Sequence, residues 1–347
     1  MTVDLFTLLL LGGGLFLGWA LGANDSANVF GTAVGTRMLR FRTAAILCSG
    51  GVILGAVISG AGPTETLGKL AAIKSVAEAS IASACAGLTV LFMTRRGLPV
   101  STSQAVVGAL IGWNIWNGFD TDMAVASKII LTWVLCPFLA AGIAALLLPI
   151  TSFALQKSRF HLFQQDAITR WALIIAGALG AYSLGANNIA NVMGPFAHSI
   201  AFPDLIIYQS LHLSGLQQLF LLGGIAVAIG VFTYSRRVMM TVGKDLFELS
   251  PVAGWVVVMA HSIVLLLFTS KALAEWLNGV GLPSLPLVPV SSSQAVIGAV
   301  LGIGLIRGRH GIRWSVLGEI GLGWVLTPLA SGLFCFTALA VLGRFNP

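Results

Sequence analysis

The stretches GANDSANVFG, at residues 22–31, and GANNIANVMG, at residues 185–194, are two copies of one motif. Two further pairs follow them in the same order. STSQAVVGALIG at 101–112 matches SSSQAVIGAVLG at 291–302, and WVLCP at 133–137 matches WVLTP at 324–328. Because the order of the motifs is kept, the sequence predicts two halves with the same internal architecture.

The composition places these halves in a membrane. Of the 347 residues, 57% are hydrophobic and 9% are charged, whereas about a quarter of a soluble domain is charged. This excludes soluble enzymes, nucleic-acid-binding proteins and secreted disulfide scaffolds, and it makes the lipid bilayer a partner. Continuously apolar runs such as TAAILCSGGVILGAVISGA at 43–61, together with 41 glycines, indicate closely packed helices and argue against a transmembrane β-barrel.

Ten apolar segments are long enough to be candidate crossings of a hydrocarbon core about 30 Å thick. They cover residues 5–36, 43–61, 77–94, 98–118, 129–150, 168–198, 214–234, 251–270, 288–306 and 314–343. An even number of crossings puts both termini on one side. If that side is outside, most of the 19 basic residues fall in inner loops, as the positive-inside rule requires. The exceptions are Lys69, Lys74, Lys128, Lys271 and Arg344. We therefore expect a multi-pass protein of the plasma (cytoplasmic) membrane with both termini outside.

The predicted fold class is an all-α polytopic membrane protein built from two inverted-topology repeats, residues 1–150 and 151–347, in one transmembrane domain. Each half has five predicted crossings, and an odd number gives the halves opposite orientations in the bilayer. In such proteins broken helices and helical hairpins meet near the midplane and form the substrate site. Segments 5–36 and 168–198 exceed the length of one crossing and carry polar clusters, so we predict that they are the broken helices. This architecture predicts transport by alternating access.

A cluster of amides with one carboxylate lies within these two segments. Its members are Asn24, Asp25, Asn28, Asn187, Asn188 and Asn191. An ionisable group at this depth is expensive and is usually paired with a cation or part of a transport path. Sodium, a hard cation, prefers such oxygens, and an unwound helix break beside Gly22 or Gly185 would add free carbonyls. The alternative is that the asparagines only join helices by hydrogen bonds.

The second pair of motifs predicts helix N-termini that bind an anion. The residues concerned are Ser101, Thr102, Ser103 and Gln104, and their counterparts Ser291, Ser292, Ser293 and Gln294. Each group follows a proline, Pro99 or Pro289, and fits the S-x-x-Q capping box, so simple capping is one interpretation. A helix N-terminus in a membrane also offers unpaired N–H groups and a positive dipole end to an oxyanion. No lysine or arginine falls in the middle of a predicted span, so we favour anion binding by dipoles, hydroxyls and a co-bound cation.

Other ionisable residues give weaker signals. His261 lies within a predicted span, and we favour a helix contact over a proton relay for it. Glu78 and Glu319 lie near span ends and are predicted to be interfacial. The sequence contains no HExxH, Walker A or GxSxG motif, so we expect no catalytic residues and no enzyme activity.

At these motifs the chain resembles the inorganic phosphate transporter (PiT) family. GANDSANVFGTAVG resembles its signature GANDVANAFGTSVG, GANNIANVMGPFA resembles the second-half copy, and PVSTSQAVVGA resembles PVSTTHAIVGA. The resemblance implies a homodimeric symporter of an inorganic oxyanion with no cofactor other than a co-transported sodium ion or proton. It also implies that Asn24, Asp25, Asn187 and Asn188 hold sodium, and that Asn28 and Asn191 join the two Ser/Thr clusters and Gln104 and Gln294 around the anion.

The chain departs from the family pattern at three positions. Asn188 replaces an aspartate, and Gln104 and Gln294 replace histidines. Related sulfate permeases also have a GxNN-type second motif and lack that histidine, so sulfate is the alternative substrate, although the first signature favours phosphate. A passive anion channel is a second alternative. An intramembrane metal enzyme is disfavoured, because Asp25 is the only acidic residue in the motif.

Overall fold

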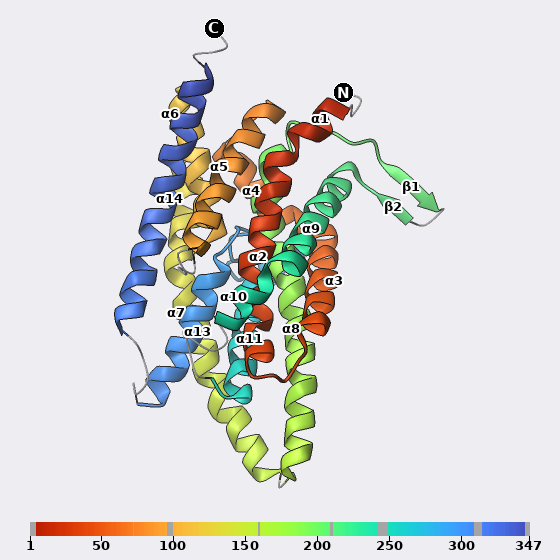
Figure 1. Ribbon diagram of the computed structural model, residues 1–347, viewed down its shortest axis with the longest axis vertical. Helices are drawn as coiled ribbons and strands as arrows, with labels where there is room; N and C mark the ends of the chain where they lie inside the picture. The colour runs from red at the N-terminus through yellow and green to blue at the C-terminus, as the bar shows by residue number, and fades with distance from the viewer. Residues whose placement is uncertain are drawn as a thin grey trace.

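The computed structural model describes residues 5–71, 73–95, 100–158, 160–208, 211–241, 249–308 and 314–343. Pro99 and Arg344, which entered the predictions above, lie outside these ranges. Within them the protein is a helical bundle (Figure 1). The prediction of an all-α polytopic membrane protein is confirmed, with one small antiparallel pair of strands as an addition.

The elements follow one another along the chain as a series of long and short helices. They are α1 (Leu5–Leu10), α2 (Gly12–Gly35), α3 (Phe41–Ser59), α4 (Ala61–Leu70), α5 (Val76–Arg95), α6 (Thr102–Asn117), α7 (Met123–Lys157), α8 (Leu162–Met193), the 3-10 helix η1 (Gly194–Phe196), β1 (Leu205–Tyr208), β2 (Leu211–Leu213), α9 (Gly215–Thr233), α10 (Ser235–Thr241), α11 (Pro251–Leu267), α12 (Lys271–Gly279), α13 (Ser292–Ile306) and α14 (Trp314–Gly343).

Within the described residues, fewer helices have the length and apolar composition of a membrane span than the ten crossings predicted. Among the described residues, seven helices are long and apolar enough to span a membrane, and α11 with α12, bent by 66° at their junction, makes up to eight. The other two predicted crossings, 98–118 and 288–306, contain α6 and α13, of 16 and 15 residues. At about 1.5 Å per residue these helices fall short of a 30 Å core. Each is preceded by non-helical chain, at Val100 and over residues 282–291.

The predicted breaks beside Gly22 and Gly185 are wrong, because α2 and α8 run through both glycines as helix. These glycines allow close packing instead. A Cβ on Gly22 would lie 2.0 Å from the carbonyl oxygen of Val227, and one on Gly185 would lie 2.1 Å from that of Val52. Small residues at such positions let helix backbones approach one another in lipid.

The contacts between helices come in matched pairs. In each pair, a helix of the first half packs on one of the second half, and the corresponding helix of the second half packs on its counterpart in the first. Helix α2 packs on α9 as α8 packs on α3, and α6 packs on α14 as α13 packs on α7. Glycines lie where α6 meets α14 and where α13 meets α7: Gly108 faces Pro328 of α14, and Gly298 faces Pro137 of α7. The boundary predicted at residue 150 falls inside α7. The division into two repeats and their opposite orientation in the bilayer stay predictions.

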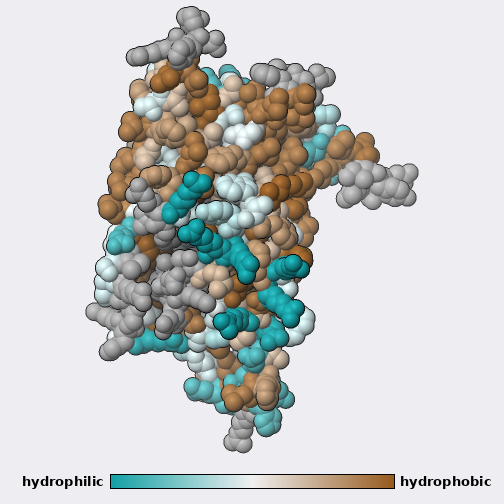
Figure 2. All heavy atoms as spheres, in the orientation of Figure 1, coloured by the Kyte–Doolittle hydropathy of each residue, from teal (hydrophilic) through white to brown (hydrophobic). Residues whose placement is uncertain are grey.

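The outer surface suits a lipid environment. Large apolar side chains, including Leu54, Phe138, Leu146 and Leu333, are exposed. Figure 2 shows hydrophobic side chains over the upper part of one face, with hydrophilic side chains gathered across its middle and at its lower end. Helix α1 and the C-terminal end of α14 lie at the same, upper end of the molecule (Figure 1).

Candidate functional site

The two serine motifs begin α6 and α13 in the same way. Ser101 and Ser291 are the N-caps, and the hydroxyl of each accepts a hydrogen bond from the backbone N–H three residues later, at 3.3 Å. The predicted capping box is half formed, because the side chains of Gln104 and Gln294 do not return to the cap residues. Because the serine hydroxyls alone cap the two helices, both glutamine side chains are free for another role.

Asn24 of α2 and Asn187 of α8 hold the backbone that leads into these caps. Asn24 Nδ2 lies 3.4 Å from the carbonyl oxygen of Val100, and Asn187 Nδ2 donates to that of Val290 at 2.9 Å. The amide oxygen of Asn187 also accepts from the N–H of Val290 at 3.1 Å. The two signature motifs thus position the starts of α6 and α13.

Serines from the two helix starts cross over to the opposite half. Ser103 of α6 donates to the carbonyl oxygen of Val290 at 3.1 Å, and Ser293 of α13 donates to that of Val100 at 3.3 Å. Each non-helical carbonyl therefore receives donors from both halves. The two helix N-termini are joined in one hydrogen-bonded network.

Asp25 lies at the centre of this network. Its side chain is 3% exposed, and it is the only buried carboxylate among the residues that the structure describes. Asn24 Nδ2 donates to one carboxylate oxygen at 2.8 Å and Asn188 Nδ2 to the other at 3.2 Å. Asn188 Oδ1 in turn accepts from Asn187 at 3.0 Å and from Asn191 at 3.1 Å. Amides from both halves therefore surround one negative charge.

The last asparagine of each signature reaches the opposite serine motif. Asn28 donates to Ser292 Oγ at 3.0 Å, and Asn191 donates to Ser103 Oγ at 2.9 Å. His261 of α11 is fully buried, and its Nε2 lies 2.8 Å from the same Ser292 Oγ. His261 therefore makes a hydrogen-bonded contact between helices, as favoured from the sequence, and the structure adds that its partner belongs to the second serine motif.

All fourteen predicted site residues thus converge, and all but the half-buried Asn28 are buried. Four of their polar atoms receive no hydrogen bond from any residue in the described ranges: Thr102 Oγ1, Gln104 Oε1, Asn191 Oδ1 and Gln294 Oε1. Two helix N-termini with hydroxyls suit an oxyanion, and a carboxylate among amide oxygens suits a hard cation. The roles assigned to these residues stay predictions.

The sequence patterns missed Val100, Val290 and Thr94 as contributors to the site, and they did not predict the partner of Glu78 outside it. The carbonyls of Val100 and Val290 belong to the backbone, so residue type gives no signal for them. Thr94, at the end of α5, donates to Asn24 Oδ1 at 3.3 Å and stands outside both motifs. Glu78, predicted to be interfacial, accepts a hydrogen bond from the indole of Trp113 at 2.9 Å.

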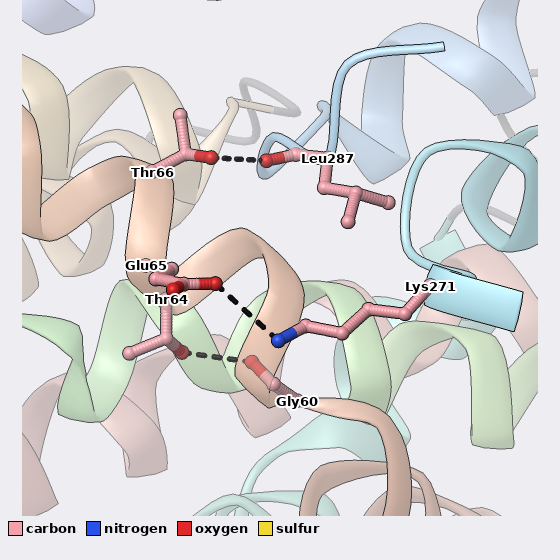
Figure 3. Close-up of polar contacts among 6 residues, drawn as sticks. All are labelled: Gly60, Thr64, Glu65, Thr66, Lys271 and Leu287. Atoms are coloured by element: carbon pink, nitrogen blue, oxygen red, sulfur yellow. Dashed lines mark hydrogen bonds and ion pairs between the residues drawn. The ribbon is translucent and has the colours of Figure 1, made fainter. Parts of the chain in front are cut away.

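A separate cavity of about 410 Å³ opens where α4 meets α12 and the segment before α13. Figure 3 shows Lys271 reaching from α12 to Glu65 of α4, at 3.3 Å, and the hydroxyl of Thr66 facing the carbonyl oxygen of Leu287, at 2.6 Å. Both side chains of the ion pair are about half exposed or more, and such pairs contribute about 0–1 kcal/mol. These contacts connect α4 to α12 and to the chain leading into α13.

Comparison with known proteins gives a consistent family. The sequence profile described as "Phosphate transporter family" matches residues 21–335. A relative from Methanocaldococcus jannaschii, named "Putative phosphate permease", is 27% identical over 92% of this chain and 93% of its own length. The "Sulfate permease CysP" of Bacillus subtilis is 28% identical over 91% of this chain and 82% of its own length.

A solved structure shares the architecture. The chain described as "The sodium-dependent phosphate transporter" superposes with a TM-score of 0.80 and 24% sequence identity, covering 98% of this chain and all of that one. At this level of identity the likeness establishes the fold. The family match over residues 21–335, together with the seven or more candidate membrane spans among the described residues, supports a multi-pass membrane transporter rather than an enzyme.

Proposed function

This chain belongs to the phosphate transporter family, and from that premise we propose that it carries inorganic phosphate across the membrane by sodium-coupled symport with alternating access. A proton gradient is the second candidate driving force. The observation that carries the proposal is Asp25, a buried carboxylate bonded to amides of both halves beside two helix N-termini. A symporter of an anion and a cation needs a negatively charged group for the cation and hydrogen-bond donors for the anion within one enclosed site.

The anion is assigned to the starts of α6 and α13. Their first-turn N–H groups and the hydroxyls of Thr102 and Ser292 supply donors, and Asn28 and Asn191 fix the serines around them. None of the buried polar residues in the described ranges is a lysine or an arginine. Helix dipoles and hydroxyls, with a co-bound cation, would therefore balance the negative charge.

Sodium is assigned to the oxygens of Asn24, Asp25, Asn187 and Asn188. In the present arrangement the amide nitrogens of Asn24 and Asn188 point at Asp25. A bound cation would attract the carboxylate and the amide oxygens and compete with these hydrogen bonds. Cation binding would in this way change the contacts that hold the two halves together.

Sulfate transport is the second candidate. It is favoured by the neutral Asn188 beside Asp25, because the site then carries one carboxylate rather than two, and by similarity to the Bacillus subtilis protein named as a sulfate permease. A passive anion channel would use the same polar residues. It would conduct without saturation and without coupling to a cation.

Reconstitution into proteoliposomes tests these candidates together. Radiolabelled phosphate and sulfate would be supplied side by side under an inward sodium gradient, an inward proton gradient, or no gradient. We expect sodium-dependent accumulation of phosphate that sulfate blocks poorly. Preferred sulfate accumulation would reassign the substrate, and phosphate uptake indifferent to every cation gradient would refute symport.

We also propose a homodimer in the plasma (cytoplasmic) membrane with both termini outside. The mass of the detergent-purified protein by light scattering, corrected for bound detergent, tests the dimer. A cysteine introduced at Lys69 tests the orientation, since a membrane-impermeant maleimide should label it from outside the cell. Labelling solely after permeabilisation would reverse the assignment.

A further inference from the structure

Gln104 and Gln294 occupy equivalent positions in the first turns of α6 and α13, yet they do not act as capping residues. Two other glutamines of this chain show what capping looks like. Gln164 of α8 and Gln217 of α9 return to the backbone N–H of their cap residues, at 3.2 and 2.9 Å, and complete the capping box. The contrast sets the two site glutamines apart from ordinary helix starts.

Both site glutamines are buried with an unused acceptor. Their side chains are 3% and 4% exposed, and Oε1 of each receives no hydrogen bond from any part of the chain that the structure describes. A buried acceptor left without a donor costs about 1–3 kcal/mol. The same arrangement occurs in both halves, so a donor supplied by a ligand is the simplest account of it.

The position of these oxygens favours a proton of the anion over a metal cation. Both glutamines lie in the first turn of a helix, where the dipole and the free N–H groups create a positive field that repels cations and attracts anions. The buried carboxylate Asp25 offers the cation a better place. At neutral pH inorganic phosphate carries at least one P–OH group, which is a donor, whereas sulfate carries none.

We propose that Gln104 and Gln294 are specificity-determining residues, whose side-chain carbonyls accept hydrogen bonds from the P–OH groups of bound phosphate: dihydrogen phosphate has one for each glutamine, and hydrogen phosphate has one for either of them. This inference rests on the proposed transport function and assigns its substrate choice. Sulfate would leave both acceptors unpaired and bring its own oxygen atoms against them. Sites built to hydrogen-bond a substrate hydroxyl discriminate strongly against analogues that lack it.

Competition against radiolabelled phosphate uptake in proteoliposomes tests the proposal. The competitors are arsenate, which carries the hydroxyl, sulfate, which lacks it, and monofluorophosphate, in which fluorine replaces it at nearly the same size and charge. With the unmodified protein we expect arsenate to compete at least about tenfold better than monofluorophosphate or sulfate. Equal competition by arsenate and monofluorophosphate would overturn the inference while leaving phosphate transport intact.

Variants then locate the effect. Gln104→Met and Gln294→Met remove the acceptor and should shrink the gap between arsenate and monofluorophosphate by roughly tenfold or more. Gln→His at the same positions keeps an acceptor nitrogen and should retain the gap. Gln217→Met, which removes a cap on α9, should leave the gap unchanged. Where a variant cannot be reconstituted, thermal shifts with each anion give the same comparison on purified protein.

Two results would refute the assignment of these glutamines in particular. One is a methionine pair that changes the half-saturating sodium concentration while leaving the order of the anions unchanged, which would make the glutamines cation ligands. The other is an unchanged gap in all methionine variants. Absence of any uptake by the unmodified protein under a sodium gradient would instead refute the proposed function.

Discussion

Replacing Asn188 with aspartate would set a second carboxylate directly against Asp25. Asn188 Nδ2 lies 3.2 Å from a carboxylate oxygen of Asp25, so the variant exchanges an attractive hydrogen bond for two like charges at that separation. Coulomb's law with an effective dielectric constant of about 20 gives a repulsion of about 5 kcal/mol. A bound cation or a proton must relieve it for the folded state to persist.

The expected consequence is a stronger dependence of folding on sodium. If sodium relieves about a third of the repulsion, its apparent affinity rises roughly tenfold, because each 1.4 kcal/mol is a factor of ten. Thermal unfolding of the purified variant, measured over a range of sodium concentrations with choline as the replacement ion, reports this affinity. Unfolding temperature should be lowered without sodium and recover as sodium is added.

Asn114→Asp is the matched control. Asn114 is also buried, but its amide donates to the backbone of Leu70 and to Thr121 at the other end of α6, with no carboxylate among these partners. That variant should be destabilised by burial of a charge without gaining sodium dependence. Equal behaviour of the two variants, with or without sodium, would refute the reasoning.

Three further predictions concern the site and its packing. Asp25→Asn should abolish concentrative uptake while leaving expression intact; concentrative uptake by this variant would reject the role given to the carboxylate. Gly298→Ala places a Cβ 2.1 Å from the carbonyl oxygen of Pro137 and should destabilise the protein by about 1–3 kcal/mol, whereas Gly50→Ala, with nothing within 4 Å, should not lower the unfolding temperature. His261→Ala removes a hydrogen bond to a site serine and should raise the phosphate KM about fivefold; the same KM as the unmodified protein would show that the histidine only fills space.

The sequence predicted which segments are apolar helices better than it predicted where those helices begin and whether they are broken. Apolar length identified seven spans, but it also merged α13 and the buried, non-helical residues 288–291 into one crossing, because hydropathy does not distinguish a buried extended segment from a buried helix. Gly22 and Gly185 were predicted as breaks and are packing positions. A glycine fits both situations, and the deciding neighbours, Val227 and Val52, lie on distant helices.

For the site, the repeated motifs predicted which residues converge, since identical patterns in two halves single out the same positions. They did not predict the pairing across the halves, such as Asn191 with Ser103, because a repeat does not specify which copy contacts which. Nor did they predict His261, a single residue without a repeated partner in the motifs. The capping box was predicted from spacing alone, and spacing does not record that Gln104 has been left free of the cap.

The exchange of helices between the halves has a consequence for biosynthesis. Gly108 of α6 meets its neighbour, Pro328, only when α14 is present, and α14 is synthesised long after α6. The first half therefore enters the bilayer before the helix that covers its glycine surface has been made, and that surface stays uncovered until α14 arrives.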